Sequence, residues 1–173
     1  MNKKIFKEKT PKKSVVMASR PFKDIPLQLI KCFCGCSDMT PAEVRRIYSL
    51  TNSVHETLLD PQATRLFRKF LEMKRSGDKT AADQYLDIYE KCSEFLPETQ
   101  RTFTQDEVDE LVDLGLPYDL EQHLSRRMLS GNRTDINSGL YRIQGKCRNE
   151  IEASSDFADF RNAIVDKMRR VPK

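Results

Sequence analysis

The chain has 173 residues, of which 38% are hydrophobic and 32% are charged, and its net charge is +4. This length fits one domain of ordinary size with a tail, and no apolar run approaches the length of a membrane-spanning helix. Residues 1–16 are basic but lack the apolar stretch of a secretory signal. We therefore expect a cytoplasmic protein whose five cysteines are reduced.

The positive charge is concentrated at the start of the chain. Residues 1–31 carry nine basic and two acidic side chains, a net charge of +7, whereas the other 142 residues carry 21 basic and 24 acidic ones. Residues 1 to about 20 are rich in lysine and show no helical or strand periodicity, which is typical of disorder. We interpret residues 1–37 as a basic disordered tail and a cysteine-containing lead-in segment, and residues 38–173 as a helical domain.

A basic tail of this kind has three interpretations. It binds anionic lipid electrostatically, which would make the protein peripheral at the plasma membrane; it is a nuclear-import or nucleic-acid patch; or it is solvated and has no partner. Nucleic acid is the weakest of the three, because Phe6 is the one aromatic side chain in the lysine-rich residues 1–20 that could stack on a base.

Three cysteines alternate with other residues just before the predicted domain, at Cys32, Cys34 and Cys36. A closed zinc site needs four ligands, so these three thiols predict no metal site. Their position beside a basic tail fits S-palmitoylation, since stable anchoring takes two membrane signals. The structural alternative is that they are small buried hydrophobic residues where the chain enters its first helix.

Helix signals follow one another from residue 40 onward. Thr40-Pro41-Ala42-Glu43 combines an N-cap, a proline at the first helical position and a glutamate at the third, and Asp60-Pro61 repeats the start signal. The last helix begins at Ser154 or Ser155 and ends near Arg169. Between these, we expect helices over residues 79–95, 105–114, 119–129 and 135–151. No segment alternates like a strand, so the sequence predicts an all-α fold, an irregular bundle of at least six helices.

Motifs of catalysis and of cofactor binding are absent from the sequence. It has no Walker loop, no GxSxG elbow, no HExxH and no GxGxxG. His55 and His123 lie on different predicted helices, and no sequence signature makes either one a base. We therefore expect that the protein is not an enzyme, that it has no catalytic residue, and that it binds neither a metal nor a cofactor.

Three blocks of the sequence, in this order, resemble the RGS (regulator of G-protein signalling) family. Residues 53–72 resemble a helix that ends in paired leucines and the helix after it, residues 81–90 resemble the central helix, and residues 140–160 resemble the long penultimate helix and the aromatic turn that follows. The apolar positions that carry the resemblance are Leu58, Leu59, Phe67, Phe70, Leu71, Tyr85, Phe157 and Phe160.

This resemblance implies about nine helices in a bundle subdomain and a terminal subdomain. It also implies a domain that binds a G-protein α subunit (Gα) and accelerates GTP hydrolysis by holding the switch loops of the GTPase, without adding a catalytic side chain. In the family, loop residues including two Asn, an Asp and an Arg make these contacts. The matching positions, which form the predicted partner-binding surface, are Ala81, Asp83, Gly115, Pro117, Ser155, Asp156 and Asp159.

Several of these positions depart from the family pattern. The first Asn falls on Ala81 or its neighbours Lys79 and Thr80, after an insertion over residues 74–78. The second falls near residues 115–117, where no amide stands, and Asp159 replaces the Arg, which reverses its charge. Losing an amide contact or inverting a charge at an interface costs several kcal/mol. We therefore expect a Gα-binding regulator with weakened GTPase activation, and the alternative is a catalytically silent RGS-like module that binds another protein or peptide.

Overall fold

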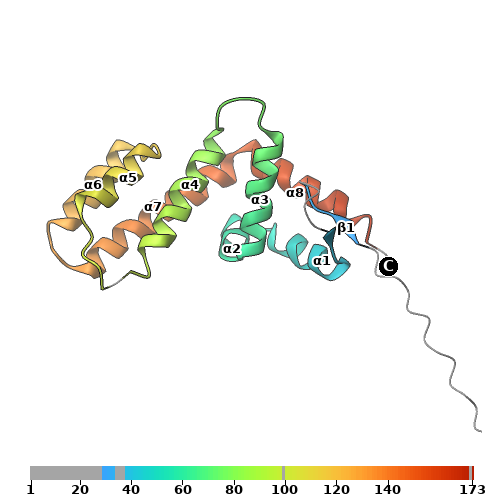
Figure 1. The fold of residues 1–173 in the computed structure, drawn as a ribbon, viewed down its shortest axis with the longest axis horizontal. Coiled ribbons are helices and arrows are strands. Elements are labelled where there is room, and N and C mark those ends of the chain that lie inside the picture. Colours follow the sequence, from blue (N-terminus) through green and yellow to red (C-terminus); the bar gives the residue numbers. More distant parts are fainter. Residues whose placement is uncertain (1–28, 34–37, 99, 172) are drawn as a thin grey trace, which may run out of the picture.

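The structure is a computed structural model that describes residues 29–33, 38–98, 100–171 and 173. In these residues it contains eight α-helices and one pair of two-residue strands (Figure 1), which confirms the predicted all-α class. In chain order the elements are β1 (Ile30–Lys31), β2 (Asp38–Met39), α1 (Pro41–Leu50), α2 (Val54–Leu59), α3 (Pro61–Lys74), α4 (Ala81–Phe95), α5 (Gln105–Asp113), α6 (Tyr118–Met128), α7 (Arg133–Ala153) and α8 (Ser155–Met168).

Helices α1, α3 and α8 begin where the sequence signals place them. The Thr40 hydroxyl accepts a hydrogen bond from the Glu43 N–H at 3.2 Å, and the Glu43 carboxylate accepts one from the Thr40 N–H at 2.7 Å. Asp60 accepts from the Ala63 N–H at 2.8 Å, and Ser154 caps α8. These bonds satisfy N–H groups that the first turn of a helix leaves unpaired, which is why short sequence motifs locate the starts.

The short helix α2 joins its two neighbours through threonine hydroxyls. The Thr57 hydroxyl donates to the carbonyl of Leu50 at 2.9 Å, which ties α2 to the end of α1. The Thr64 hydroxyl donates to the carbonyl of Thr57 at 3.2 Å, which ties α3 to α2. This six-residue helix is too short to show a helical period by itself. With α2 included, the described residues form eight helices. The sequence signals predict at least six, and the resemblance implies about nine.

The helices form two groups along an elongated molecule (Figure 1). Helices α4 and α7 pack side by side through the middle, α6 packs on α7, and α5 packs on α6. At the other end, α8 contacts α1, α3 and α7, and α2 contacts α1 and α3. Helix α7 therefore belongs to both groups and connects them.

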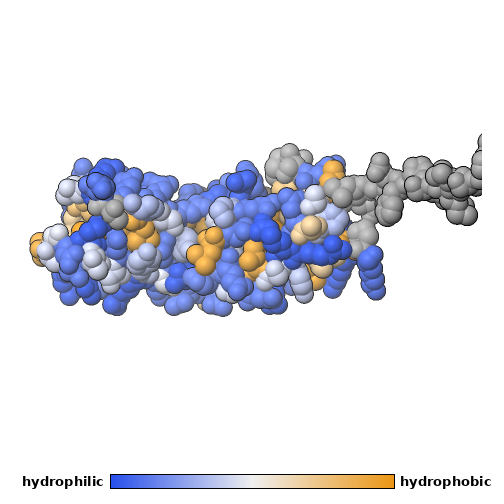
Figure 2. Space-filling view, turned by 90° about the horizontal axis from the view of Figure 1, so that it is seen from below, coloured by the Kyte–Doolittle hydropathy of each residue, from blue (hydrophilic) through white to orange (hydrophobic). Residues whose placement is uncertain are grey.

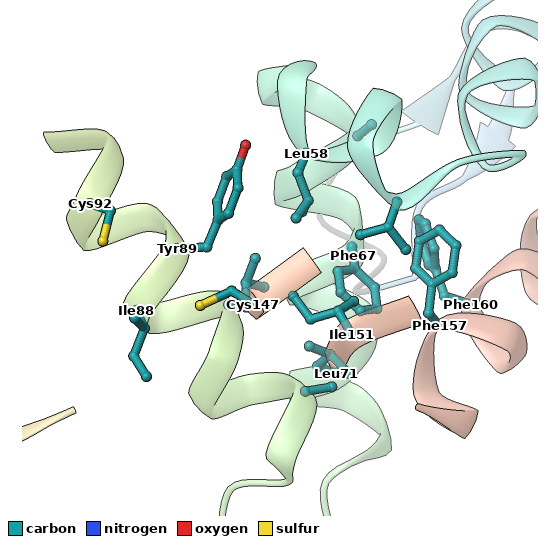
Figure 3. Close-up of a cluster of buried hydrophobic side chains, with 14 of the residues drawn as sticks. Leu58, Phe67, Leu71, Ile88, Tyr89, Cys92, Cys147, Ile151, Phe157 and Phe160 are labelled. Atoms are coloured by element: carbon teal, nitrogen blue, oxygen red, sulfur yellow. The ribbon is translucent and has the colours of Figure 1, made fainter. Parts of the chain in front are cut away.

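A cluster of phenylalanine rings fills the core of the group that holds α3 and α8. Phe67 lies 5.1 Å from Phe160 and 5.5 Å from Phe157 between ring centroids, and Phe70 lies 5.7 Å from Phe160. Figure 3 shows the rings of Phe67, Phe157 and Phe160 beside Ile151 of α7, with side chains of α4 further along the same core. The four phenylalanine positions of the resemblance are thus core positions, whereas Tyr85 is half-buried and Leu59 is 63% exposed.

The surface seen in Figure 2 is mainly hydrophilic, and its hydrophobic patches are separate from one another. The large apolar side chains that are exposed among the described residues are Leu29, Leu59, Met73, Val112, Tyr118, Leu129 and Tyr141. They belong to different elements, and scattered apolar side chains of this kind are usual on a protein surface. None of the helices in the described ranges is long and apolar enough to cross a bilayer.

Candidate functional site

Three connections meet on one side of the molecule, and we call them together the three-loop surface. They are the α3–α4 loop (residues 75–80), the α5–α6 turn (114–117) and the start of α8 (154–159) (Figure 1). Each contains or adjoins positions of the predicted partner-binding surface. Two side chains that flank the first connection reach the other two: Lys74, the last residue of α3, contacts the start of α8, and Gln84, near the start of α4, contacts the α5–α6 turn. The three connections therefore adjoin one another.

Lys74 joins the end of α3 to the start of α8. Its ammonium group donates a hydrogen bond to Asp156 at 2.8 Å and to Asp159 at 2.5 Å. These two carboxylates raise the pKa of Lys74 above its ordinary value, Asp156 contributing most. Asp156 is nearly buried and Asp159 is exposed. The negative charge of Asp159, where the resemblance expects an Arg, is therefore compensated within the chain by the first residue of the insertion.

Arg75 joins the same loop to the first turn of α4. Its guanidinium lies 2.7 Å from a carboxylate oxygen of Asp83, whose side chain is fully buried. The other carboxylate oxygen accepts from the N–H and the hydroxyl of Thr80, at 3.1 and 3.2 Å. Asp83 thus caps α4 and holds the loop in place, and none of its surface is left for a partner in this arrangement.

Gly115 ends α5 in a left-handed conformation, with φ of +94°. The N–H of Gly115 donates to the carbonyl of Val112, and the N–H of Leu116 donates to that of Leu111, which together form a Schellman motif. The Gln84 side chain of α4 then donates to the carbonyl of Gly115 at 3.1 Å. A Cβ atom at this glycine would lie 1.8 Å from Nε2 of Gln84. An asparagine here would therefore require Gln84 to move.

The other predicted surface residues differ in how accessible they are. Ala81 is the first residue of α4 and is exposed, as are Gly115, Ser155 and Asp159. Pro117 is half-buried at the start of α6, where its carbonyl accepts from the N–H groups of residues 120 and 121. The surface open to a partner consists of the exposed residues together with the loop over residues 76–79.

A pocket of about 290 Å³ opens between the α3–α4 loop and the start of α8. Its lining residues are Leu71, Lys74, Arg75, Ser76, Gly77, Asp78, Thr80 and Asp156. The lining combines cations, carboxylates and hydroxyls and includes neither histidine nor cysteine.

The cysteine cluster is described only in part. Cys32 is buried at 7% exposure beside β1, which agrees with the structural alternative for this residue. Cys34 and Cys36 lie outside the described residues, so lipidation of the cluster stays a prediction. Among the residues that the structure does describe, no group of three or more His, Cys, Asp or Glu side chains is arranged to hold a metal ion.

Sequence reasoning missed the residues that hold the three-loop surface together. Lys74 and Arg75 were visible only as parts of an insertion, and Gln84 carried no signal at all. Their partners lie 82, 8 and 31 positions away in the sequence. Contacts over such separations depend on how the helices pack, which periodicity does not specify.

Comparisons of this chain with known protein families, with curated proteins and with solved structures find no match. Assignments of family and partner therefore depend on the sequence blocks and on the geometry of the three-loop surface.

Proposed function

We propose that this chain is an RGS-like regulatory domain that binds a G-protein α subunit through the three-loop surface. One observation carries the proposal: the three segments that the resemblance assigns to Gα contact are held together by the Lys74 and Gln84 contacts. Rigid helices support each of them, so the surface is preorganised for a partner. The two helix groups are what the bundle and terminal subdomains of the resemblance would require.

Such a domain acts on the site of another protein. Gα supplies its own catalytic arginine and glutamine, and the regulator contributes only by holding the switch loops in their transition-state arrangement. Ala81, Gly115 and Asp159 stand where the resemblance expects an amide, an amide and a guanidinium. We therefore expect Gα binding with little acceleration of GTP hydrolysis.

Binding of the full chain to purified Gα subunits tests the proposal. Gα of each subfamily is loaded with GDP or with GDP and aluminium fluoride, which mimics the transition state, and titrated with the chain. We expect at least one subfamily to bind, with the transition-state form preferred. No binding to either form in any subfamily, at concentrations well above usual regulator affinities, would sink the proposal.

Substitutions at two positions test whether Gα binds through the three-loop surface. Asp159→Arg combined with Ala81→Asn restores the groups that the resemblance expects, and should raise Gα affinity and single-turnover GTP hydrolysis. Asp166→Arg is the matched control, because it makes the same charge change on an exposed aspartate of the same helix. An equal effect of the control would mean that net charge is responsible.

The alternative function is a catalytically silent interaction module for another protein or peptide. The Lys74–Asp159 ion pair favours this alternative, because it occupies the place where the resemblance expects an arginine that contacts Gα. The same hydrolysis assay separates the two candidates. If a protein partner binds the three-loop surface while no Gα does, the silent module is the correct function; if GTP hydrolysis rises, it is wrong.

A further inference from the structure

The charges of the folded body are separated between its two ends. Helices α5 and α6 hold seven acidic and two basic side chains, a net charge of −5 over residues 105–128. At the opposite end (Figure 1), residues 29–33 and 165–173 hold five basic side chains and one acidic, a net charge of +4. We call this second region the basic end. Its exposed basic residues are Lys31, Arg169, Arg170 and Lys173, whereas the fifth, Lys167, is buried.

The basic end is also where residues 1–28 join the described body. Strand β1 pairs with β2, with Ile30 opposite Met39, and both of these side chains are buried. The Lys167 ammonium group donates to the carbonyl of Lys31 and lies 4.5 Å from the centre of the Phe33 ring. These contacts fix the segment 29–33 against α8. The eight basic and two acidic residues of positions 1–28 are thereby attached at the end that is already positive.

An apolar side chain accompanies these cations. Leu29 is 52% exposed, and it lines a hollow of about 370 Å³ together with Ile30, Lys31 and Arg170. Arginine and lysine with an exposed leucine suit the interface of an anionic bilayer, where cations meet the headgroups and an apolar side chain enters the acyl boundary. Strands of nucleic acid are instead bound by stacking on exposed aromatic rings, and the one ring here, Phe33, is packed under Lys167 and against Phe70.

We propose that the basic end docks the folded body on an anionic lipid surface, with α5 and α6 pointing away from it. Attraction at one end and repulsion at the other orient the molecule along its length. The three-loop surface lies along one side of the molecule, with its α5–α6 turn within the acidic end, and it stays open to a partner (Figure 1). This docking concerns the folded body, and it does not depend on the proposed function.

Charge reversal at each end tests the contribution of the basic end. Full chain, Arg169→Glu/Arg170→Glu and Arg126→Glu/Arg142→Glu are sedimented with vesicles of phosphatidylcholine alone or with 30% phosphatidylserine as a test composition. The second variant is the matched control, because its arginines are exposed near His123, in the α6–α7 region, and the net charge change is the same. We expect the first variant to lose about tenfold in partition to the anionic vesicles and the control less than about twofold.

Equal losses in both variants would show that net charge alone drives partition and would overturn the proposal. No loss in the first variant would do the same. Both variants are first checked for an unchanged thermal midpoint. If Arg169→Glu/Arg170→Glu weakened binding to a DNA duplex while vesicle binding stayed intact, the basic end would be a nucleic-acid surface and the lipid assignment would be wrong.

Orientation is measured with a single tryptophan, because the chain contains none of its own. Leu29→Trp places the probe at the basic end, and Leu129→Trp places it after α6, at a leucine that is 87% exposed. With vesicles that contain brominated lipid, we expect quenching and a blue shift for Leu29→Trp and neither for Leu129→Trp. Equal quenching of both, or quenching of Leu129→Trp alone, would contradict end-on docking.

Discussion

Lys74 and Asp159, 85 positions apart in the sequence, form an ion pair across the three-loop surface, with 2.5 Å between Nζ and Oδ2. The same ammonium group reaches Asp156, which is nearly buried in the first turn of α8. The pair gives the negative charge of Asp159 a cationic partner within the chain. It also explains how an aspartate is accommodated where the resemblance expects an arginine.

Truncating Lys74 should lower the free energy of unfolding more than truncating Asp159. The side chains of Lys74 and Asp159 are 39% and 47% exposed, so a double-mutant cycle to alanine should give a coupling of about 0.5 kcal/mol. Lys74→Ala also strips Asp156 of its cation. Urea unfolding measures both effects. The Arg169–Asp166 pair, at 75% and 61% exposure, is the control and should couple more weakly.

Gly115→Ala should destabilise the protein by about 2 kcal/mol, because the left-handed conformation disfavours a Cβ atom and Gln84 lies in its way. Gly131→Ala is the matched control: its φ is +64°, but nothing lies within 4 Å of the added Cβ, so only the conformational cost of about 1 kcal/mol remains. Thermal or urea unfolding gives both values. Equal losses at the two glycines would show that the contact with Gln84 is unimportant.

Glu107 should make stability depend on pH in the acidic range. Burial opposes ionisation of Glu107, but hydrogen bonds from Thr104 and the charge of Arg101 hold the pKa of Glu107 below its ordinary value of 4.5. Because the folded pKa is the lower one, its stabilisation is present above about pH 4.5 and is lost as the pH falls. Glu107→Gln should therefore flatten the unfolding free energy between about pH 5 and 3. Urea unfolding of both proteins across this pH range measures the change; an unaltered pH dependence in Glu107→Gln would contradict the role given to Glu107.

The two thiols in the α4–α7 interface should resist alkylation in the folded protein. Burial raises the pKa of Cys147 to about 12, and burial also raises the pKa of Cys92 above its ordinary value. Thiolates are the reactive species, so neither residue should label at neutral pH until the protein unfolds. Peptide mapping after iodoacetamide treatment, with and without denaturant, measures this. Rapid labelling of Cys147 under native conditions would contradict the packing of α7 against α4.

Local signals in the sequence predicted much of the fold. The starts of α1, α3 and α8 follow from capping residues at Thr40, Asp60 and Ser154, because a cap needs only neighbours within three positions. Helix α2 has a cap at Ser53, but its six residues are too few for a clear period. Its separation from α3 depends on Thr57 and Thr64 hydrogen bonds that a sequence pattern does not display.

The candidate site was less predictable than the fold. Gly115 could be placed at a helix end from its residue type, yet the reason that a side chain is excluded there is Gln84, on another helix. Asp83 looked like a surface acid, and only the structure places its carboxylate between Arg75 and Thr80. Lys167 is buried, and its ammonium group donates a hydrogen bond to the carbonyl of Lys31. Its burial could not be predicted from the sequence, because lysine is usually exposed.

The most direct test of the account is a titration of Gα, loaded with GDP and aluminium fluoride, with the full chain and with Asp159→Arg/Ala81→Asn. We predict measurable binding by the natural chain to at least one Gα subfamily, tighter binding by the variant, and no such gain in the Asp166→Arg control. Absence of binding by both chains to every Gα subfamily would contradict it.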